Sequence, residues 1–590
     1  MLQSKTVKIL LVSAMSLGMA ACGRNNVENG QAVLSQDVGV LQYVPADTPY
    51  VFATSGTIPA DVLSKLEENS DSVFTSYENL LETMLDEVNE FEPDSEKQED
   101  ARRMMLLGKE LAALMNSERL QEAGIPHNPQ MAVYGVGMLP VYRIALEDPA
   151  AFEATIAELE ETAGGELLEG EIDGQPYLYF EDEGIRIILG VFDDQFVATI
   201  APTELSDELL DDVLGLELPN ESLAQSDELM EIADHYDFTP HALGFFDVER
   251  MVATFLDEPT GVNAELLALM NYDSSALTDV CRSEIREMSA VMPRVVTGYT
   301  DLTATEISSN TVFELRSDLA SGLSTLAAPV SGLGIDPGGF FSFGMSLDLV
   351  AARDFFAGQL DALEAEPYEC ELLAELQTSM LQGRQVLNQP LVPPFDGIKG
   401  FLAVVDSIDG LDFENEQLPT SVGARFLLAN DDPASLLAML GLFSPEVARL
   451  NLQPDGNPVQ LDVAQLTGQP QPFLVDSTYV AMTDDALAVA IGDSSASRLA
   501  ELFNADTGGI PPVFSAHLDS SRYYELIAQA LEAEYQTAKV STDGEALPAD
   551  VEAALNRLMT GAGEMVERLS MNVIFTENGI EFPASATLPE

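Results

Sequence analysis

The chain has 590 residues, with 99 Asp and Glu against 26 Lys and Arg, so its formal net charge is −73. The hydrophobic fraction of 46% is that of a folded protein, so this acidity is not the acidity of a disordered chain. Nucleic-acid binding is excluded because phosphates require Lys and Arg, and electrostatic docking on anionic lipid is disfavoured for the same reason. Because the carboxylates are spread along the chain, they favour an exported protein adapted to salt over one that collects cations or a basic partner.

Residues 1–21 are predicted to be a lipoprotein signal peptide. Two lysines precede an apolar stretch, residues 9–19, that is too short to span a bilayer, and two alanines then precede Cys22. This pattern resembles the lipobox of bacterial lipoproteins, with Met19 where that family most often has Leu. The resemblance implies cleavage before Cys22, diacylglycerol on its sulfur, and acylation of its amino group with a fatty acid such as palmitate. The alternative is a plain secretory signal with an incidental cysteine.

The residues after the lipobox predict where the protein is held. Gly23 follows Cys22 in place of Asp, which in enteric-type sorting implies the outer membrane, and we expect the protein to face the periplasm. Residues 22–40 are polar and lack strong periodicity, so they are predicted to be a flexible tether. No later segment has 18 consecutive apolar residues, so the Cys22 lipid is the expected membrane attachment.

The first part of the folded chain is predicted to alternate strands and amphipathic helices. An aromatic strand and a helix occupy residues 48–66, and helical spacing continues over 60–120 with an acidic break at 91–100. Later helices are expected to begin at Asp, whose carboxylate accepts hydrogen bonds from the free amide groups of the first turn. The remaining elements are, in chain order, a strand and helix over 141–157 with Asp148-Pro149, strands at 171–180 and 184–202 with a turn at Asp193-Asp194, a strand and helix over 242–256 with Asp247 and Arg250, and a helix and strand pair over 286–315.

The rest of the chain repeats this order of elements, which predicts an internal duplication. We expect α+β architecture with two related units, 41–318 and 338–590, and a linker at 319–337. Each unit would have an antiparallel sheet with helices packed on one side. The repeated elements are a strand and helix over 338–356, helices over 349–386, a strand and helix over 425–441 with Asp432-Pro433, strands at 466–476 and 477–493 with a turn at Asp484-Asp485, a strand and helix over 514–531 with Asp519 and Arg522, and a helix and strand pair over 563–588 with Asn578-Gly579.

The opening of the first unit also carries a short family resemblance. The segment YVPADTPYVFA, with Pro45-Ala46-Asp47-Thr48 and Tyr50, resembles the start of an uncharacterised family of exported bacterial proteins. The resemblance implies an exported domain that begins with a strand, and it supplies no catalytic residues.

Three cysteines are present, and lipidation of Cys22 leaves Cys281 and Cys370. An even pair in an oxidising compartment predicts one disulfide, with two separate buried thiols as the alternative. A bond between them would connect the last helical region of the first unit to the first helices of the second.

Two clusters have residues that could hold a metal ion, although no cofactor is the leading expectation. Carboxylates at Asp406, Asp409 and Asp412 could ligate calcium, but their spacing does not match the EF-hand pattern. A second cluster, DHYDFTPH, has His and Asp ligands for zinc or a harder ion. Its residues are Asp234, His235, Asp237 and His241.

The sequence favours a non-enzymatic role. It has no G-x-S-x-G, H-E-x-x-H, G-x-x-x-x-G-K-[ST] or strand-borne G-x-G-x-x-G motif, and the Asp-x-x-Arg pairs fit helix caps. The leading hypothesis is a membrane-anchored envelope lipoprotein that binds or scaffolds an envelope protein, a peptide or a lipid, by default in a cleft between the units. A carboxylate-dependent envelope hydrolase and a purely structural surface lipoprotein are the alternatives.

The lipid anchor gives the first testable prediction. Replacing Cys22 with Ser removes the sulfur that would carry the acyl chains, so we expect the variant to move from the membrane to the soluble fraction. Fractionation of cells that express each form measures this. Continued tight membrane association of Cys22→Ser would contradict the anchor.

Overall fold

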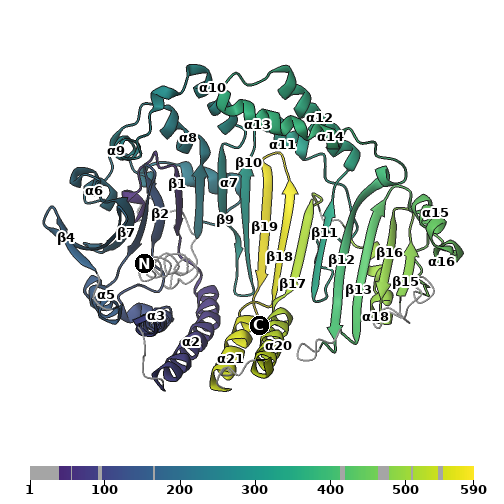
Figure 1. The fold of residues 1–590 in the computed structure, drawn as a ribbon, viewed down its shortest axis with the longest axis horizontal. Helices are drawn as coiled ribbons and strands as arrows, with labels where there is room; N and C mark the ends of the chain where they lie inside the picture. Colours follow the sequence, from purple (N-terminus) through teal and green to yellow (C-terminus); the bar gives the residue numbers. More distant parts are fainter. Residues whose placement is uncertain are drawn as a thin grey trace.

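The computed structural model describes residues 39–54, 56–90, 96–163, 167–411, 419–462, 478–506, 509–541 and 549–589. In this part of the chain, helices accompany one 19-stranded sheet whose pairings are all antiparallel, which confirms the α+β class (Figure 1). The signal peptide, Cys22, the tether up to residue 38 and the strand expected at 466–476 lie outside the described residues. No described helix is both long and apolar enough to cross a membrane.

The first part of the chain forms most of the expected elements. Residues 171–180, expected as one strand, belong instead to a hairpin that turns at Asp173-Gly174, where both φ angles are positive. The strands are β1 (Tyr50–Thr54), β2 (Met131–Val136), β3 (Leu139–Ala145), β4 (Leu168–Ile172), β5 (Gln175–Asp182), β6 (Ile185–Phe192), β7 (Gln195–Pro202), β8 (Ala242–Asp247), β9 (Arg294–Leu302) and β10 (Glu306–Glu314). The helices are α2 (Ala60–Glu90), α3 (Glu96–Leu114), α4 (Ser117–Glu122), α5 (Pro149–Ala163), α6 (Asp207–Leu214), α7 (Glu228–Tyr236), α8 (Val248–Leu256), α9 (Gly261–Leu269), α10 (Asp279–Ser289) and α11 (Ser317–Leu323).

The second part follows with a similar succession. Its strands are β11 (Phe341–Ser346), β12 (Ile398–Asp409), β13 (Ser421–Asn430), β14 (Val459–Gln460), β15 (Thr478–Met482), β16 (Ala486–Ile491), β17 (Phe514–Asp519), β18 (Arg568–Phe575) and β19 (Gly579–Thr587). Its helices are α12 (Leu349–Ala365), α13 (Glu371–Gln382), α14 (Arg384–Leu387), α15 (Pro433–Phe443), α16 (Pro445–Arg449), α18 (Asp493–Ser497), α19 (Leu499–Phe503), α20 (Ser520–Ser541) and α21 (Ala549–Met565). The expected turns at Asp484-Asp485 and Asn578-Gly579 join β15 to β16 and β18 to β19.

Aspartates cap the helices that follow these strands, as the sequence predicts. The Asp148 carboxylate accepts hydrogen bonds from the amides of Ala150 and Ala151 at the start of α5, both at 3.1 Å. Asp432 accepts from the amide of Ser435 in α15 at 2.9 Å. Each cap satisfies amide groups that a first helical turn leaves without a backbone partner.

The two halves form a single sheet because their last strands pair. Strands β10 and β19 pair through nine residue pairs, from Glu306 with Thr587 to Glu314 with Gly579. The sheet therefore runs β4-β5-β6-β7-β3-β2-β1-β8-β9-β10 and continues as β19-β18-β17-β11-β12-β13-β16-β15-β14. Two separate sheets, as the sequence suggests, would each have left this strand as an unpaired edge.

We call the pair of strands β10 and β19 the seam. The order of neighbouring strands is the same in both halves when it is read outward from this seam. From β10 the first half continues as β9, β8, β1, β2, β3, β7, β6 and β5, and from β19 the second continues as β18, β17, β11, β12, β13, β16, β15 and β14. The shared order agrees with the expected repeat, while an internal duplication stays a prediction.

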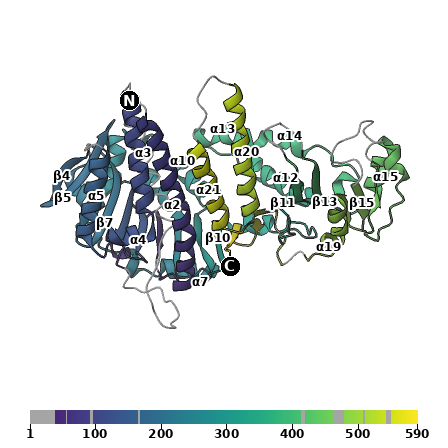
Figure 2. The same cartoon turned by 90° about the horizontal axis from the view of Figure 1, so that it is seen from below.

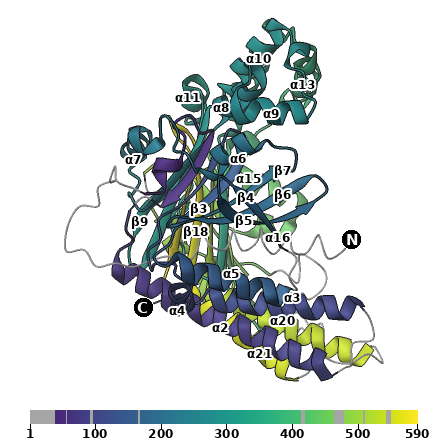
Figure 3. The ribbon, with the colours of Figure 1, turned by 90° about the vertical axis from the view of Figure 1, so that its left-hand side faces the viewer.

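The sheet has two unequal faces, and helices reach both of them rather than one. On the face that we call the covered face, helices α6 and α7 pack on the first half, and α18 and α19 pack on the second. On the other face, helix α5 packs through Phe152 and helix α15 through Leu437. Figure 3 shows α7 on one side of the strands and α5 on the other. Strands β2 and β3 carry apolar side chains on both faces, with Tyr134 and Val141 toward the covered face and Met131 and Ile144 toward α5, so helices pack on both sides there.

The predicted linker also belongs to the covered face. Leu326, Val330 and Leu333 are each 1% exposed, and Val330 and Leu333 pack beneath the second half of the sheet. The approach is close, because a Cβ added at Gly344 would lie 2.6 Å from the Leu333 side chain. The joining segment is therefore part of the core of the second half.

Four helices lie side by side beyond one end of the strands, in the order α3, α2, α21 and α20 (Figure 2). Leu80 of α2 packs against Val551 and Ala554 of α21. The Asn69 side chain also donates a hydrogen bond to the Met565 carbonyl at 3.2 Å. A helix of the first half and one of the second are thus packed together.

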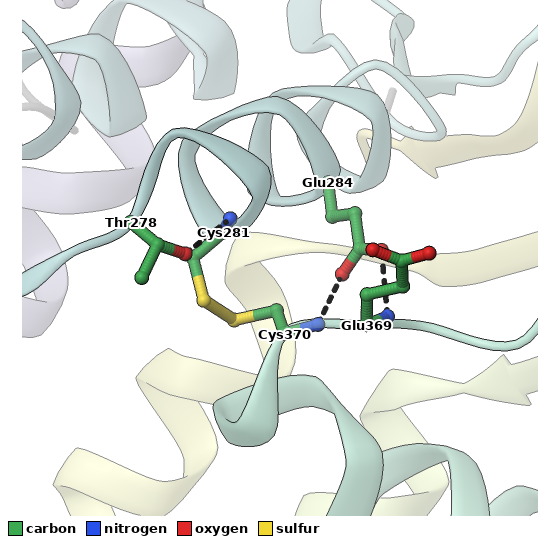
Figure 4. The surroundings of a disulfide bond; sticks show 5 residues. All are labelled: Thr278, Cys281, Glu284, Glu369 and Cys370. Atoms are coloured by element: carbon green, nitrogen blue, oxygen red, sulfur yellow. Dashed lines mark hydrogen bonds between the residues drawn. A yellow bond between two sulfur atoms is a disulfide. The ribbon is translucent and has the colours of Figure 1, made fainter.

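A disulfide links the two halves beyond the opposite end of the strands. Cys281 in α10 and Cys370 before α13 are bonded, with their Cα atoms 4.7 Å apart (Figure 4). The Glu284 carboxylate accepts hydrogen bonds from the amides of Glu369 at 2.8 Å and Cys370 at 2.9 Å. Cys370 is 1% exposed and Cys281 8%, so the bond lies inside a small apolar cluster.

Removing this bond should lower the stability of the fold. The cysteines are 89 residues apart in sequence, and loss of a native disulfide typically costs about 2–5 kcal/mol. We expect Cys281→Ser and Cys370→Ser to lower the unfolding midpoint in denaturant by similar amounts. Reductant should lower the wild-type midpoint and leave both variants unchanged, and a midpoint indifferent to reductant would contradict a contribution from the bond.

Candidate functional site

Asp406, the first of the expected calcium ligands, is the centre of a buried ion cluster. It lies at an irregularity in β12, between Val405 and Ser407, where a bulge directs its carboxylate toward the covered face. The carboxylate accepts hydrogen bonds from Arg425 at 2.6 Å, Arg498 at 2.8 Å and the Ser495 hydroxyl at 2.6 Å. Two guanidinium groups and one hydroxyl thus occupy the oxygens that a cation would need.

The same arginines attach the linker to the sheet. Arg425 is only 1% exposed, and it donates to the Pro337 carbonyl at 3.1 Å. Arg498 donates to that carbonyl at 2.8 Å. A buried charge is tolerated only when it is paired and hydrogen-bonded, so this cluster fixes the end of the linker against β12 and β13.

Asp409, the second expected calcium ligand, does not share the cluster of Asp406. Asp409 ends β12, and its carboxylate accepts a hydrogen bond from the Ser421 hydroxyl at 3.0 Å. Asp412 lies outside the described residues. Among the described residues, no group of three His, Cys, Asp or Glu side chains is placed to hold a metal ion.

The histidine cluster DHYDFTPH is dispersed in the same way. His235 in α7 lies 3.3 Å from the Asn578 side chain, and Asp237 follows that helix in a left-handed conformation. Burial lowers the pKa of His241. The expected ligands therefore belong to a helix end and the loop that follows it, and the structure does not bring them around one point.

The Asp-x-x-Arg pairs act as helix caps. Asp247 accepts a hydrogen bond from the Arg250 amide at 2.8 Å, and their side chains form an ion pair at 3.1 Å. Asp519 accepts from the Arg522 amide at 3.0 Å. Helix capping therefore accounts for the Asp-x-x-Arg motif.

A hollow of about 450 Å³ lies at the seam between the halves. Helix α7 and strands β9 and β10 form one side of it, and the β18–β19 turn forms the other. Its walls are mainly polar, and Arg294 is already paired with the Glu314 carboxylate at 2.8 and 3.1 Å. The expected cleft between the units is thus present, but without the apolar walls of a lipid or peptide site.

A second candidate surface is the second half of the sheet, on the side opposite the covered face. We call it the open face and define it by the outward side chains of β18, β17, β11, β12 and β13. The register places these side chains on one side, because residues paired across strands share a face. They are Leu569, Met571 and Val573; Phe514, Ala516 and Leu518; Phe341, Phe343 and Met345; Phe401, Ala403 and Val405; and Ala424, Phe426 and Leu428.

The open face is apolar and in part accessible to solvent. Phe343 is 38% exposed, Met345 49%, Phe426 40%, and Leu569 and Met571 42% each. The rings of Phe343 and Phe401 lie 5.8 Å apart, and those of Phe401 and Phe426 lie 5.9 Å apart. The result is a row of aromatic rings that crosses three neighbouring strands. Soluble proteins rarely leave contiguous apolar surface uncovered, and such patches mark sites where proteins bind a partner, a ligand or a membrane.

The arrangement of the helices leaves this surface accessible. Figure 1 looks onto the open face, and no described helix crosses in front of β18, β17, β11 or β12. Helices α20 and α21 stand beyond one end of the strands, and α12 and α13 stand beyond the other. Figure 3 shows helices above and below the sheet on the side to which α5 belongs. The open face is therefore a floor between two helical walls.

Sequence reasoning missed this site, although the alternation in β11 indicated a two-sided strand. The segment Phe-Ser-Phe-Gly-Met-Ser alternates large apolar and small residues, and such a pattern normally turns its apolar side inward. Here the small side is inward: Ser342 and Ser346 are buried, and the side chain of Leu333 in the linker lies close to Gly344. His517 lies on this inner side between Ser515 and Ser570, and burial lowers its pKa.

Comparisons of the chain with known protein families, with curated proteins and with solved structures give no match.

The Asp406 cluster gives a prediction that separates a structural role from calcium binding. Its side chain is 11% exposed, and removal of one partner of a buried ion pair costs about 3–5 kcal/mol. We expect Asp406→Ala to lose stability of this size in denaturant unfolding, and the exposed Asp409→Ala to lose little. Added calcium should leave the wild-type melting temperature unchanged. A rise with calcium that Asp406→Ala abolishes would favour the ligand role.

Proposed function

We propose that the protein is a lipid-anchored lipoprotein of the bacterial cell envelope that binds an apolar partner on the open face and has no enzymatic role. The expected position is the outer membrane, on its periplasmic side, with the Cys22 lipid as the attachment. The leader sequence supports the anchor, and the open face supports the binding role.

The observation that carries the binding role is the exposure of a continuous apolar sheet surface. The five most exposed of its large side chains belong to three strands, β18, β11 and β13, and a single strand separates each of these from the next. They are Phe343, Met345, Phe426, Leu569 and Met571. Burying apolar surface stabilises a complex by about 25 cal/mol per Å², so a partner that covers these side chains gains affinity from each of them. A purely structural protein has no need to keep them accessible.

The repeated strand order supports a related proposal about origin. We infer that the two halves descend from one duplicated unit, since nine strands follow in the same order in each. Helices α5 and α15 occupy equivalent places in this order and cover equivalent strands. The open face lies between α15 and the seam.

Binding of a neutral apolar dye tests the proposed function. Nile red fluoresces when it leaves water for an apolar surface, so we expect the wild-type protein to enhance its emission. The double variant Phe343→Asn/Phe426→Asn removes two aromatic rings from the open face and should reduce the enhancement severalfold, as expected for lost apolar area. Titration of the dye against each protein measures the change.

A matched control comes from another exposed apolar pair. Leu442 and Phe443 at the end of α15 are 83% and 82% exposed, and neither belongs to the open face. The variant Leu442→Asn/Phe443→Asn should keep wild-type dye binding. Equal emission from all three proteins would refute the open face as a binding surface, and circular dichroism and the melting temperature verify that each variant is folded.

A further inference from the structure

We propose that the partner of the open face is a polypeptide, and specifically a cationic amphipathic helix laid across the strands. This inference rests on the proposed function and names the chemistry of what is bound. Three features support it, namely the neutrality of the floor, the acidity of its walls, and its dimensions.

The floor contains no charged side chain, although the chain as a whole is 21% charged. Every outward residue of β18, β17, β11, β12 and β13 that defines the open face is Phe, Leu, Met, Val or Ala. The apolar stripe of an amphipathic helix fits such a floor, because its side chains can be buried there without leaving a polar group in the interface unpaired.

The helical walls present carboxylates. In the wall formed by α12 to α14, Arg353 is already paired with Asp354 at 2.8 Å, and Arg384 with Asp361 at 2.6 Å and Glu364 at 3.2 Å. The remaining carboxylates of that wall include Glu366, Glu369, Glu371 and Glu375.

The opposite wall of the open face also has a net negative charge. Helices α20 and α21, which form this wall, together contain six Asp and Glu residues against three Arg and Lys residues. Acidic residues thus outnumber basic ones in both walls of the floor, and this excess of negative charge attracts Lys and Arg.

The dimensions of the floor fit one helix. Five strands at a spacing of about 4.8 Å span about 19 Å, which is the length of an α-helix of about 13 residues. The outward residues of β11 extend over five positions, or about 14 Å, which accommodates a helix about 10–12 Å in diameter. A helix of three to four turns can thus contact the whole floor with its apolar stripe and extend its basic side chains toward the walls.

The charge also disfavours the other occupants of an apolar surface. A second copy of the chain would bring another net charge of −73 to the same place. An anionic bilayer would be repelled for the same reason. The negative charge that repels a second copy of the chain and an anionic bilayer attracts a cationic peptide.

Model peptides test the inference. We would use a fluorescein-labelled 18-residue helix of Leu and Lys, its counterpart with Glu in place of Lys, and a scrambled Leu/Lys peptide without an apolar stripe. Fluorescence anisotropy at 50 and 500 mM NaCl measures binding to the full chain and to the two double variants described above. Co-sedimentation with vesicles of zwitterionic phosphatidylcholine measures lipid binding in parallel.

We expect the Leu/Lys helix to bind at least about tenfold more tightly than either other peptide, because it alone combines the apolar stripe with positive charge. Phe343→Asn/Phe426→Asn should weaken this binding about tenfold, Leu442→Asn/Phe443→Asn should not change it, and high salt should weaken it.

The remaining outcomes decide against the inference in distinguishable ways. If Nile red binds the open face but the Glu peptide binds as tightly as the Lys peptide, the cationic partner is wrong and the apolar site stands. Binding of vesicles that depends on Phe343 and Phe426, without peptide selectivity, would identify the partner as lipid. Tight binding of the Lys peptide that the Phe343→Asn/Phe426→Asn variant retains would mean that acidity alone attracts it. Failure of dye binding would reject the proposed function itself.

Discussion

The pairing of β10 with β19 is the constraint on which the rest of the architecture depends. Nine residue pairs join the last strand of the first half to the last strand of the second, so the two halves share one sheet. The helical layer α3-α2-α21-α20 and the Cys281–Cys370 bond then connect the halves beyond the two ends of the strands. With both strand ends bridged in this way, the sheet is held as the floor between two walls.

A second constraint decides which side of that floor is apolar and accessible. Leu333 of the linker packs against Gly344 on the inward side of β11, and the ion cluster of Asp406 with Arg425 fixes the end of the linker. Since the small side is filled by the linker, the aromatic side of β11 must face outward. The open face thus results from packing on the opposite side of the same strands, and its binding role is proposed on that basis.

The overall charge takes on a different meaning beside this surface. From composition alone, −73 indicates adaptation to salt and argues against nucleic acid. Around an uncharged apolar floor, the same carboxylates would select among apolar partners and favour those with positive charge. Electrostatics of this kind acts mainly on specificity and association rate, while the buried apolar area provides affinity.

The sequence by itself determined the local features: the Asp caps at Asp148 and Asp432, the hairpin turns at Asp484-Asp485 and Asn578-Gly579, the α+β class and the pairing of Cys281 with Cys370. These depend on short-range chemistry that a few neighbouring residues specify. The seam, the buried linker and the outward row of Phe343, Phe401 and Phe426 were decided only by the tertiary structure. They depend on contacts between residues far apart in the chain. The alternation of large apolar and small side chains along a strand does not determine which of its two sides will be covered.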